Sequence, residues 1–373
     1  MAIAAAGVHS GCGFGIDDGS HRASIEMLVL GLDDLTTGKV VVRTYKVNES
    51  NGALTQLASA TAPAVENLSF LAVSPDGRSA YVLNEAGTTD HIWGFSIAQS
   101  GTLGLIDSIP RDVANNGVAM AMTPNGSAVH VVNTATSNNW QVFVRTASTG
   151  ALSTPLNLSE SGGVALGGIV FAPDGTHAYV IRQGATDSLS SHALSANGSP
   201  NATGNPNPNN SSSLNPQMDV LPNGTQVLVS ETGQDVVPFM ADGSGLTGVV
   251  GSATAGMGNN GGQVRVSPDG DNFYVTVTTA DTVRGFKIIP DGLQTPPAVG
   301  GSPVSMTCPN ILGLAITTSG RWLYTLCPGS LQMARVERDT STGALLGGGI
   351  LTSPDFNAEN LQPIALAIAT VAQ

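Results

Sequence analysis

The sequence predicts an all-β fold, a seven-bladed β-propeller with four antiparallel strands in each blade. Three observations predict it: a turn phrase recurs at a regular period, strand-forming residues flank each turn, and the two chain ends supply the strands of a last blade. The composition fits such a fold, since only 11% of residues are charged and the chain has 46 glycines and 21 prolines.

The recurring phrase is an apolar strand, a tight turn and a second apolar strand. The first copy reads Leu71-Ala-Val-Ser-Pro-Asp-Gly77 and continues as Ser79-Ala-Tyr-Val-Leu83. Proline fixes φ at the first corner of the turn, and Asp-Gly completes it. The turn position, at spacings of 49, 49, 49, 46 and 50 residues, is occupied by Pro75, Pro124, Pro173, Pro222, Pro268 and Thr318. A period this regular indicates a repeat fold.

Each period also has room for two more strands. In the first copy the pattern predicts a third strand over 92–97, a polar-glycine turn over 99–101 and a fourth strand over 103–107. Four strands in about 49 residues make one blade of a propeller.

The chain ends complete the ring. Residues 363–369 match a first strand, while 25–30, 40–46 and 54–57 match a second, third and fourth strand. We expect a closing blade built from 24–60 and 361–373, with 1–23 as an extension, so that 1–373 form one domain. Joining the ends in this way leaves no open edge in the ring. The alternative is six blades with a capping N-terminal hairpin.

The charge balance bounds the partners. The chain has 14 Lys and Arg against 27 Asp and Glu, a net charge of −13, which disfavours nucleic acid and anionic membranes as partners. No apolar run approaches 18 residues, so we expect no membrane span. We expect a small-molecule substrate instead, and a monomer or a homodimer.

Asn-x-Ser/Thr sequences, for example at Asn48 and Asn157, favour a glycoprotein of the secretory pathway or the extracellular space over an Asn-rich intracellular protein. The register puts Cys308 before the first strand of the sixth blade and Cys327 after its second strand, so both lie at the same end of one blade. A disulfide between them is predicted, and two free thiols are the alternative. Cys12 has no evident partner.

The phrase S-P-D-G-[RT]-x-[AF]-Y-V, its period near 50 residues and the T-G turns within the blades resemble the lactonase-type seven-bladed propellers. The resemblance runs from about Ile25 to Ala369. That family includes bacterial 6-phosphogluconolactonase and fungal carboxy-cis,cis-muconate cyclase, and fungal relatives include hetero-Diels–Alderases of tropolone sesquiterpenoid biosynthesis. The resemblance implies the fold, and it leaves the reaction open because the phrase is structural.

The register also predicts a ring of carboxamides around the channel mouth. They lie eight or five residues before the turn position, at Asn67, Asn116, Asn260, Asn310, Gln362, Gln217 and Gln263. Nine residues after the turn position, in the loop that follows the second strand, stand Asn84, Asn133, Arg182 and Glu231. The amides of the ring could orient a polar substrate and stabilise partial charge. Alternatively, each Asn of the ring caps its own turn.

The ionisable candidates come from the same loops. Arg182 and Glu231 belong to adjacent blades and could form an ion pair beside the substrate, and His91 is the side chain best suited to shuttle a proton. A solvated loop histidine is the alternative. Trp140 and Arg284 are further candidates for substrate contact. No cluster suggests a metal site, and no motif suggests a cofactor.

Three functions remain open. The favoured hypothesis is a cofactor-free cyclase or isomerase that acts on a small unsaturated substrate, including a (hetero-)Diels–Alder cyclisation in fungal secondary metabolism, because the amide-lined channel carries few charges. The second hypothesis is a lactone hydrolase, which needs a general base. The third is an extracellular binding propeller without catalysis, which the scarcity of Trp and Tyr weakens.

Overall fold

The turn phrase folds as the hairpin that joins the first two strands of each blade. In the computed structural model, Ser74 O accepts the N–H of Gly77 at 2.8 Å, and Gly77 has a φ of +68°, which glycine adopts without steric cost. The structure describes residues 24–85, 89–107, 110–113, 117–160, 162–184, 187–201, 205–207, 214–231, 236–249, 261–290, 296–351, 354 and 356–372.

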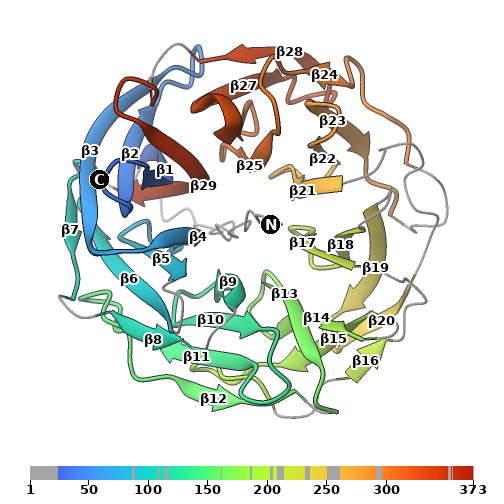
Figure 1. The fold of residues 1–373 in the computed structure, drawn as a ribbon. Helices are drawn as coiled ribbons and strands as arrows, with labels where there is room; N and C mark the ends of the chain where they lie inside the picture. The colour runs from blue at the N-terminus through green and yellow to red at the C-terminus, as the bar shows by residue number, and fades with distance from the viewer. Residues whose placement is uncertain are drawn as a thin grey trace.

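Six blades follow one another along the chain, each with its first strand nearest the centre of the ring (Figure 1). Blade 1 consists of β4 (Asn67–Val73), β5 (Ser79–Glu85), β6 (Asp90–Ile97) and β7 (Leu103–Leu105), with β8 (Arg111–Val113) also pairing with β6. Blade 2 consists of β9 (Gly117–Met122), β10 (Ala128–Asn133), β11 (Trp140–Val144) and β12 (Leu156–Leu158). Blade 3 consists of β13 (Ala165–Phe171), β14 (His177–Gln183), β15 (Ser188–Ala193) and β16 (Asn205–Asn207).

The next three blades repeat this order. Blade 4 consists of β17 (Leu214–Val220), β18 (Gln226–Glu231), β19 (Val236–Asp242) and β20 (Gly245–Val249). Blade 5 consists of β21 (Gly261–Val266), β22 (Asn272–Val277), β23 (Thr282–Lys287) and β24 (Val304–Ser305). Blade 6 consists of β25 (Leu312–Ile316), β26 (Trp322–Cys327), β27 (Gln332–Arg338) and β28 (Leu345–Ile350), with the short 3-10 helix η1 (Pro328–Ser330) between β26 and β27.

Blade 7 joins the two ends of the chain. It consists of β29 (Leu361–Ala372), β1 (Ser24–Asp34), β2 (Lys39–Val47) and β3 (Leu54–Val65), in that order from the centre outward. β29 and β1 pair antiparallel, with Leu28 opposite Ile368. The predicted seven-bladed fold and its closure by the C-terminal strand are confirmed, and all four strands of this blade are longer than predicted.

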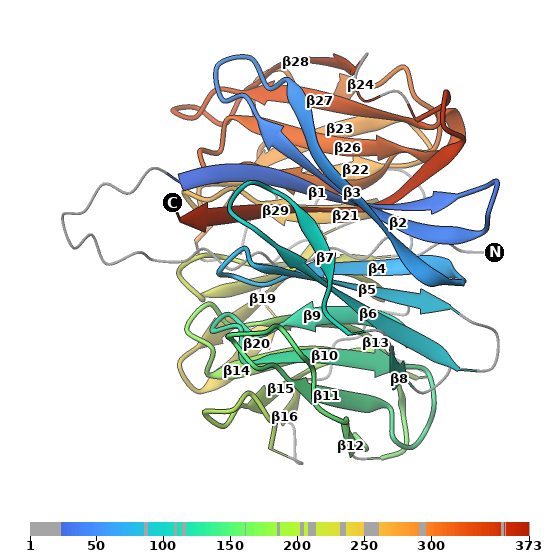
Figure 2. The ribbon, with the colours of Figure 1, turned by 90° about the vertical axis from the view of Figure 1, so that its left-hand side faces the viewer.

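The strands run between two faces of the ring (Figure 2). The hairpins that carry the turn phrase lie on one face, which we call the turn face. On the opposite face the chain crosses from the outer strand of one blade to the first strand of the next, for example at Glu66 between β3 and β4, and we call it the crossover face. The part of the chain that the structure describes has no helix long and apolar enough to span a membrane.

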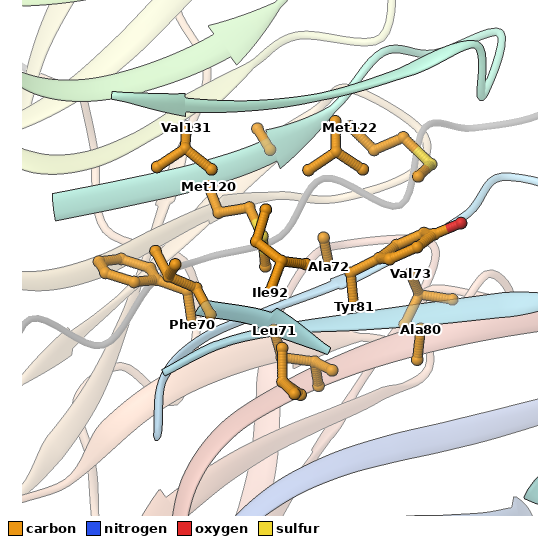
Figure 3. Close-up of a cluster of buried hydrophobic side chains, with 14 of the residues drawn as sticks. Phe70, Leu71, Ala72, Val73, Ala80, Tyr81, Ile92, Met120, Met122 and Val131 are labelled. Atoms are coloured by element: carbon orange, nitrogen blue, oxygen red, sulfur yellow. The ribbon is translucent and has the colours of Figure 1, made fainter. Parts of the chain in front are cut away.

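The core lies between neighbouring blades. Figure 3 shows Phe70, Ala72 and Ile92 of blade 1 beside Met120 and Val131 of blade 2, all buried. Strand residues alternate between the two sides of a sheet, so each blade presents an apolar side to both neighbours. Burial of these side chains between blades, rather than inside one blade, is the main driving force that holds the ring together.

The turn face adds charged clamps between blades. Arg145 of blade 2 is buried; its Nη2 lies 3.0 Å from Oδ2 of Asp76 in the blade 1 turn, and its Nε donates to Tyr81 Oη at 3.1 Å. Tyr81 in turn donates to Gly150 O at 2.6 Å. Arg338 of blade 6 makes the same contacts to Asp269 and Tyr274 of blade 5. In blades 1 and 5 the repeated phrase therefore also joins the blade to its neighbour.

Candidate functional site

A carboxylate and an imidazole meet on the crossover face of blade 1. The side chain of Glu66 is only 3% exposed, and its Oε1 lies 2.5 Å from Nδ1 of His91. Its Oε2 accepts hydrogen bonds from Asn84 Nδ2 at 2.9 Å and from Trp93 Nε1 at 3.1 Å. With two donors fixing one oxygen, the other oxygen is held in place for the imidazole.

Strand pairing positions these groups. His91, at the start of β6, lies opposite Asn84 at the end of β5 on one side and opposite Asp112 of β8 on the other. Its Nε2 is 3.6 Å from Oδ1 of Asp112, beyond hydrogen-bond length. The side chain of His91 is 22% exposed and that of Asp112 is 81% exposed. The Nε2 edge of the ring therefore faces the surface, while the Nδ1 edge faces the buried carboxylate.

This arrangement suits a general base. A carboxylate only accepts hydrogen bonds, so Glu66 fixes the proton of a neutral imidazole on Nδ1 and leaves the lone pair on Nε2. That lone pair points toward the exposed edge, where a water molecule or a substrate can approach. We call Glu66 and His91 the dyad. His91 is the proton shuttle that the sequence predicted, and its placement is compatible with that role.

A second charged cluster is enclosed in blade 3. The Glu160 side chain is 1% exposed, with Oε2 3.1 Å from His192 Nε2 and Oε1 3.4 Å from Arg182 Nε. His192 is buried and packs edge-on against Trp140, with 4.9 Å between the ring centroids. Arg182 thus forms an ion pair with Glu160, whereas the sequence suggested Glu231. The side chain of Glu231, at the end of β18, lies outside the described part of the structure.

The position nine residues after the turn has a shared structural role. In blades 1 and 3 it holds Asn84 and Arg182, which contact Glu66 and Glu160 in the loops that lead into their own blades. In blade 6 it holds Cys327, which forms a disulfide with Cys308, the Cα atoms being 5.5 Å apart. The disulfide is the pairing that the register indicated. In three blades this position therefore fastens the incoming loop.

Asn133 occupies this position in blade 2. It is fully buried, donates to Asn138 O at 3.0 Å and accepts the N–H of Ala135 at 2.9 Å. Because Asn84 and Asn133 are both buried with internal partners, neither faces a substrate in this conformation. Both residues therefore have structural roles: Asn84 holds the Glu66 side chain, and Asn133 bonds within its own loop.

The other predicted carboxamides that the structure describes differ in their surroundings. Asn67 is exposed at the start of β4, whereas Gln217 and Gln263 are buried on first strands. Asn310 is exposed with a φ of +58°, and its N–H is capped by Asp281 Oδ1 at 2.7 Å. Gln362 Nε2 reaches Pro328 O at 3.5 Å. The predicted members Asn116 and Asn260 lie outside the described residues.

Two further candidates lie on the third strands of their blades, β11 and β23. Trp140 is 2% exposed, and its Nε1 donates to Nδ1 of His130 at 3.0 Å, so it belongs to the core between blades 2 and 3. Burial lowers the pKa of His130 to about 3, which keeps this ring neutral as an acceptor. Arg284 lies half-buried on β23 opposite Val275.

Sequence reasoning missed Glu66. It precedes Asn67, the residue that the register selected, by one position, and the other blades have no acid at that place, so comparing the repeats gives no equivalent residue that would point to it. Acidic residues near this face mostly cap backbone groups, as Asp33 does for Leu68 N–H and Asp90 does for Gly117 N–H, both at 2.8 Å. Only the distance to His91 distinguishes Glu66 from them.

The comparisons with known proteins agree with the fold. Residues 37–159 match the family model described as "Lactonase, 7-bladed beta-propeller". Among curated proteins, no sequence matches the chain. One similar structure is a protein from Bacteroides uniformis provisionally named 6-phosphogluconolactonase, with 21% identity and a TM-score of 0.71 over 93% of this chain and 99% of that one.

Another similar structure is the periplasmic gluconolactonase of Pseudomonas aeruginosa, with 17% identity and a TM-score of 0.71 over 93% of this chain and 99% of that one. Hydrazine synthase of Kuenenia stuttgartiensis matches with 16% identity and a TM-score of 0.52, over 72% of this chain and 75% of that one. Identities this low establish the fold and leave the reaction open. The chain thus has the seven-bladed β-propeller fold, and residues 37–159 match the family model of the lactonase-type propellers.

Proposed function

We propose that the protein is an enzyme that hydrolyses small lactones, with His91 as the general base. The observation that carries the proposal is the dyad, in which a buried carboxylate orients an imidazole whose Nε2 edge is open to solvent. Ester hydrolysis at neutral pH needs a base that accepts a proton from water, and histidine is the side chain best suited to this task. The resemblance to lactonase-type propellers supports the same reaction.

The reaction follows from the placement of the two nitrogens. His91 Nε2 takes a proton from a water molecule as its oxygen attacks the lactone carbonyl carbon. The tetrahedral intermediate then collapses, the ring C–O bond breaks, and the imidazolium returns the proton to the leaving alkoxide, which gives a hydroxy acid. Throughout the cycle Glu66 accepts the Nδ1–H and stabilises the imidazolium charge. The products contain the atoms of one lactone and one water.

The charge around the dyad selects the substrate class. Glu66 and Asp112 lie on either side of the imidazole, and the chain carries a net charge of −13. A phosphorylated or otherwise anionic lactone would be repelled, whereas an uncharged lactone would not. We therefore propose a neutral sugar lactone or a similar uncharged ring ester as the substrate.

The cyclase hypothesis has less support. It depends on carboxamides that face the substrate, and Asn84 and Asn133 instead make buried internal bonds. A binding propeller without catalysis would need no oriented imidazole. Both hypotheses predict that the protein does not accelerate lactone hydrolysis, so one assay separates them from the proposal.

The assay measures turnover of D-glucono-δ-lactone above the spontaneous rate, at pH 7 and in the presence of a chelator. We expect His91→Asn to lower kcat roughly 10²- to 10⁴-fold, the usual contribution of a general base. The matched control is His177→Asn, because His177 is a histidine of the turn face with no part in the dyad. Equal turnover by both variants, or no turnover by the wild type with any neutral lactone of a broad panel, would refute the proposal.

We also propose a location in the secretory pathway or outside the cell, with a small molecule as the partner. The Cys308–Cys327 disulfide supports the location, because such bonds persist in oxidising compartments. Mass spectrometry of the protein from its natural source tests this proposal. We expect the intact disulfide and glycans on Asn-x-Ser/Thr sites, and two free thiols on an unglycosylated chain would contradict it.

A further inference from the structure

Two positions on the first strands carry polar side chains in only two of the seven blades. Residues five and three positions before the turn share one side of each strand, since side chains alternate along a strand. In blade 7 the turn position is Thr370. Five positions before the turn, blades 1 to 7 have Phe70, Ala119, Gly168, Gln217, Gln263, Gly313 and Ala365. Three positions before the turn they have Ala72, Ala121, Val170, Asp219, Arg265, Ala315 and Ala367. All four polar members belong to the adjacent blades 4 and 5.

These side chains reach the next blade across the innermost layer of the ring. Asp219 Oδ2 of β17 accepts the N–H of Val266 in β21 at 2.8 Å. Gln263 Oε1 of β21 accepts the N–H of Leu314 in β25. In their blades, β17, β21 and β25 are the strands nearest the centre of the ring (Figure 1), so the polar group lies in the innermost layer.

Two donors of this group have no acceptor in the structure. Arg265 Nη1 donates to Val264 O at 2.8 Å, but Arg265 Nη2 and Gln263 Nε2 are buried without a hydrogen-bond partner among the described residues. Arg265 is 8% exposed and Gln263 is 3% exposed. A buried donor without an acceptor costs roughly 1–3 kcal/mol, and more when the donor is charged. Both orphaned atoms are N–H donors on the same side of one strand.

The nearby carboxylate does not fully compensate the guanidinium. Asp219 Oδ1 accepts the N–H of Val220 and its Oδ2 accepts that of Val266, each at 2.8 Å, so backbone groups engage both oxygens. Burial lowers the pKa of Arg265, and the charge of Asp219 offsets only part of that effect. The site therefore favours one further negative charge with acceptor oxygens.

We propose that Arg265 and Gln263, on the innermost strand of blade 5, form a binding site for a small organic monocarboxylate. A carboxylate offers two oxygens, one for Arg265 Nη2 and one for Gln263 Nε2, and charge-assisted bonds of this kind are strong. Because Asp219 already supplies one negative charge, a monoanion suits the site better than a phosphate dianion. The site lies in blade 5, whereas the dyad lies in blade 1, so it does not depend on the proposed hydrolysis.

The test is calorimetric titration of the intact protein with sodium gluconate and sodium propionate at constant ionic strength, with chloride and inorganic phosphate as comparison anions. Binding by the wild type should be weaker for chloride and phosphate than for the carboxylates. We expect Arg265→Met to raise the Kd for the carboxylates at least about tenfold, because it removes the charged donor. Arg78→Met removes an equal charge from an exposed position and should leave the Kd unchanged.

Gln263→Glu gives a second, sharper variant. Its carboxylate can still accept the N–H of Leu314, so the contact between blades is preserved, but the free donor is replaced by a negative charge. We expect loss of carboxylate binding without a loss of Tm, because the new carboxylate supplies the negative charge that Arg265 lacks. His91→Asn should bind the carboxylates as the wild type does, which separates this site from the dyad. Absence of carboxylate binding by the wild type, phosphate binding of equal affinity, or unchanged affinity in both variants would each overturn the proposal.

Discussion

The two ends of blade 1 use charge in opposite ways. On the turn face, Arg145 from blade 2 is 2% exposed at its side chain, and Asp76 and Tyr81 of blade 1 engage its guanidinium. On the crossover face, Glu66 is equally enclosed, but its partner His91 keeps one edge at the surface. The first cluster joins two blades. The second leaves a nitrogen free for a proton, and that difference separates a structural cluster from a candidate for catalysis.

Loss of the clamp should have the largest effect on stability. Arg145→Met would leave Asp76 and Tyr81 without their shared partner at the seam between blades 1 and 2. Breaking a buried ion pair costs about 3–5 kcal/mol, and the partial exposure of Asp76 reduces this to roughly 2–4 kcal/mol. Denaturant unfolding of the variant and the wild type measures the cost. A change below about 0.5 kcal/mol would mean that the clamp contributes no stability.

A third seam, between blades 6 and 7, pairs two acids and gives the protein a pH dependence. Glu26 Oε1 accepts the N–H of Thr318 at 2.5 Å, and Ser319 donates to Glu49 Oε2 at 2.6 Å. Burial and the neighbouring Glu49 raise the pKa of Glu26 to about 8. The folded state therefore holds a proton that the unfolded state releases near pH 4.5. This contribution to stability is complete below pH 4.5 and is lost as the pH rises to about 8.

Glu26→Gln tests the third seam. The amide mimics the protonated acid, so the variant should match the wild type at pH 4 and exceed its stability by roughly 1–3 kcal/mol at pH 8–9. Thermal unfolding at both pH values measures the difference. If the stability of the wild type and that of the variant changed equally between pH 4 and pH 9, the pKa of Glu26 would not be raised, which would contradict the prediction.

The smallest effect distinguishes two tyrosines at the same place in the repeat. Tyr81 Oη bonds to Arg145 and Gly150, whereas Tyr179 Oη in blade 3 is buried with no hydrogen-bond partner among the residues that the structure describes. Ala241 stands where blades 2 and 6 have arginine. Tyr81→Phe should cost about 1–2 kcal/mol, and Tyr179→Phe should lie within about 0.5 kcal/mol of the wild type. Equal costs for the two substitutions would mean that the clamp does not act through the hydroxyl group.

The repeat made the fold predictable from the sequence, but it described the site poorly. Pro75 and its equivalents, the glycines after them and the strands beside them repeat because every blade needs the same hairpin, so one copy predicts the others. Glu66 and His91 occur in one blade and are 25 positions apart. Their meeting depends on the path of a loop that the period does not determine.

The surroundings of the predicted carboxamides could not be predicted for a related reason. Register shows which end of a blade a residue occupies, but it does not show whether the side chain turns outward or bonds to its own loop. Asn84 and Asn133 turned inward because buried loop and turn groups required partners. The cysteines were easier to predict, since Cys308 and Cys327 needed only to share one end of one blade.

The central claim is that the crossover face carries the reaction and the turn face carries stability. The most direct test is kcat for a neutral lactone, measured for Glu66→Gln and Arg145→Met at a temperature where both variants are folded. A glutamine amide that donates to Nδ1 would move the histidine proton to Nε2 and remove the base. The account predicts a loss of at least about 100-fold for Glu66→Gln and a change within about twofold for Arg145→Met. Equal turnover for both variants, or the larger loss for Arg145→Met, would contradict it.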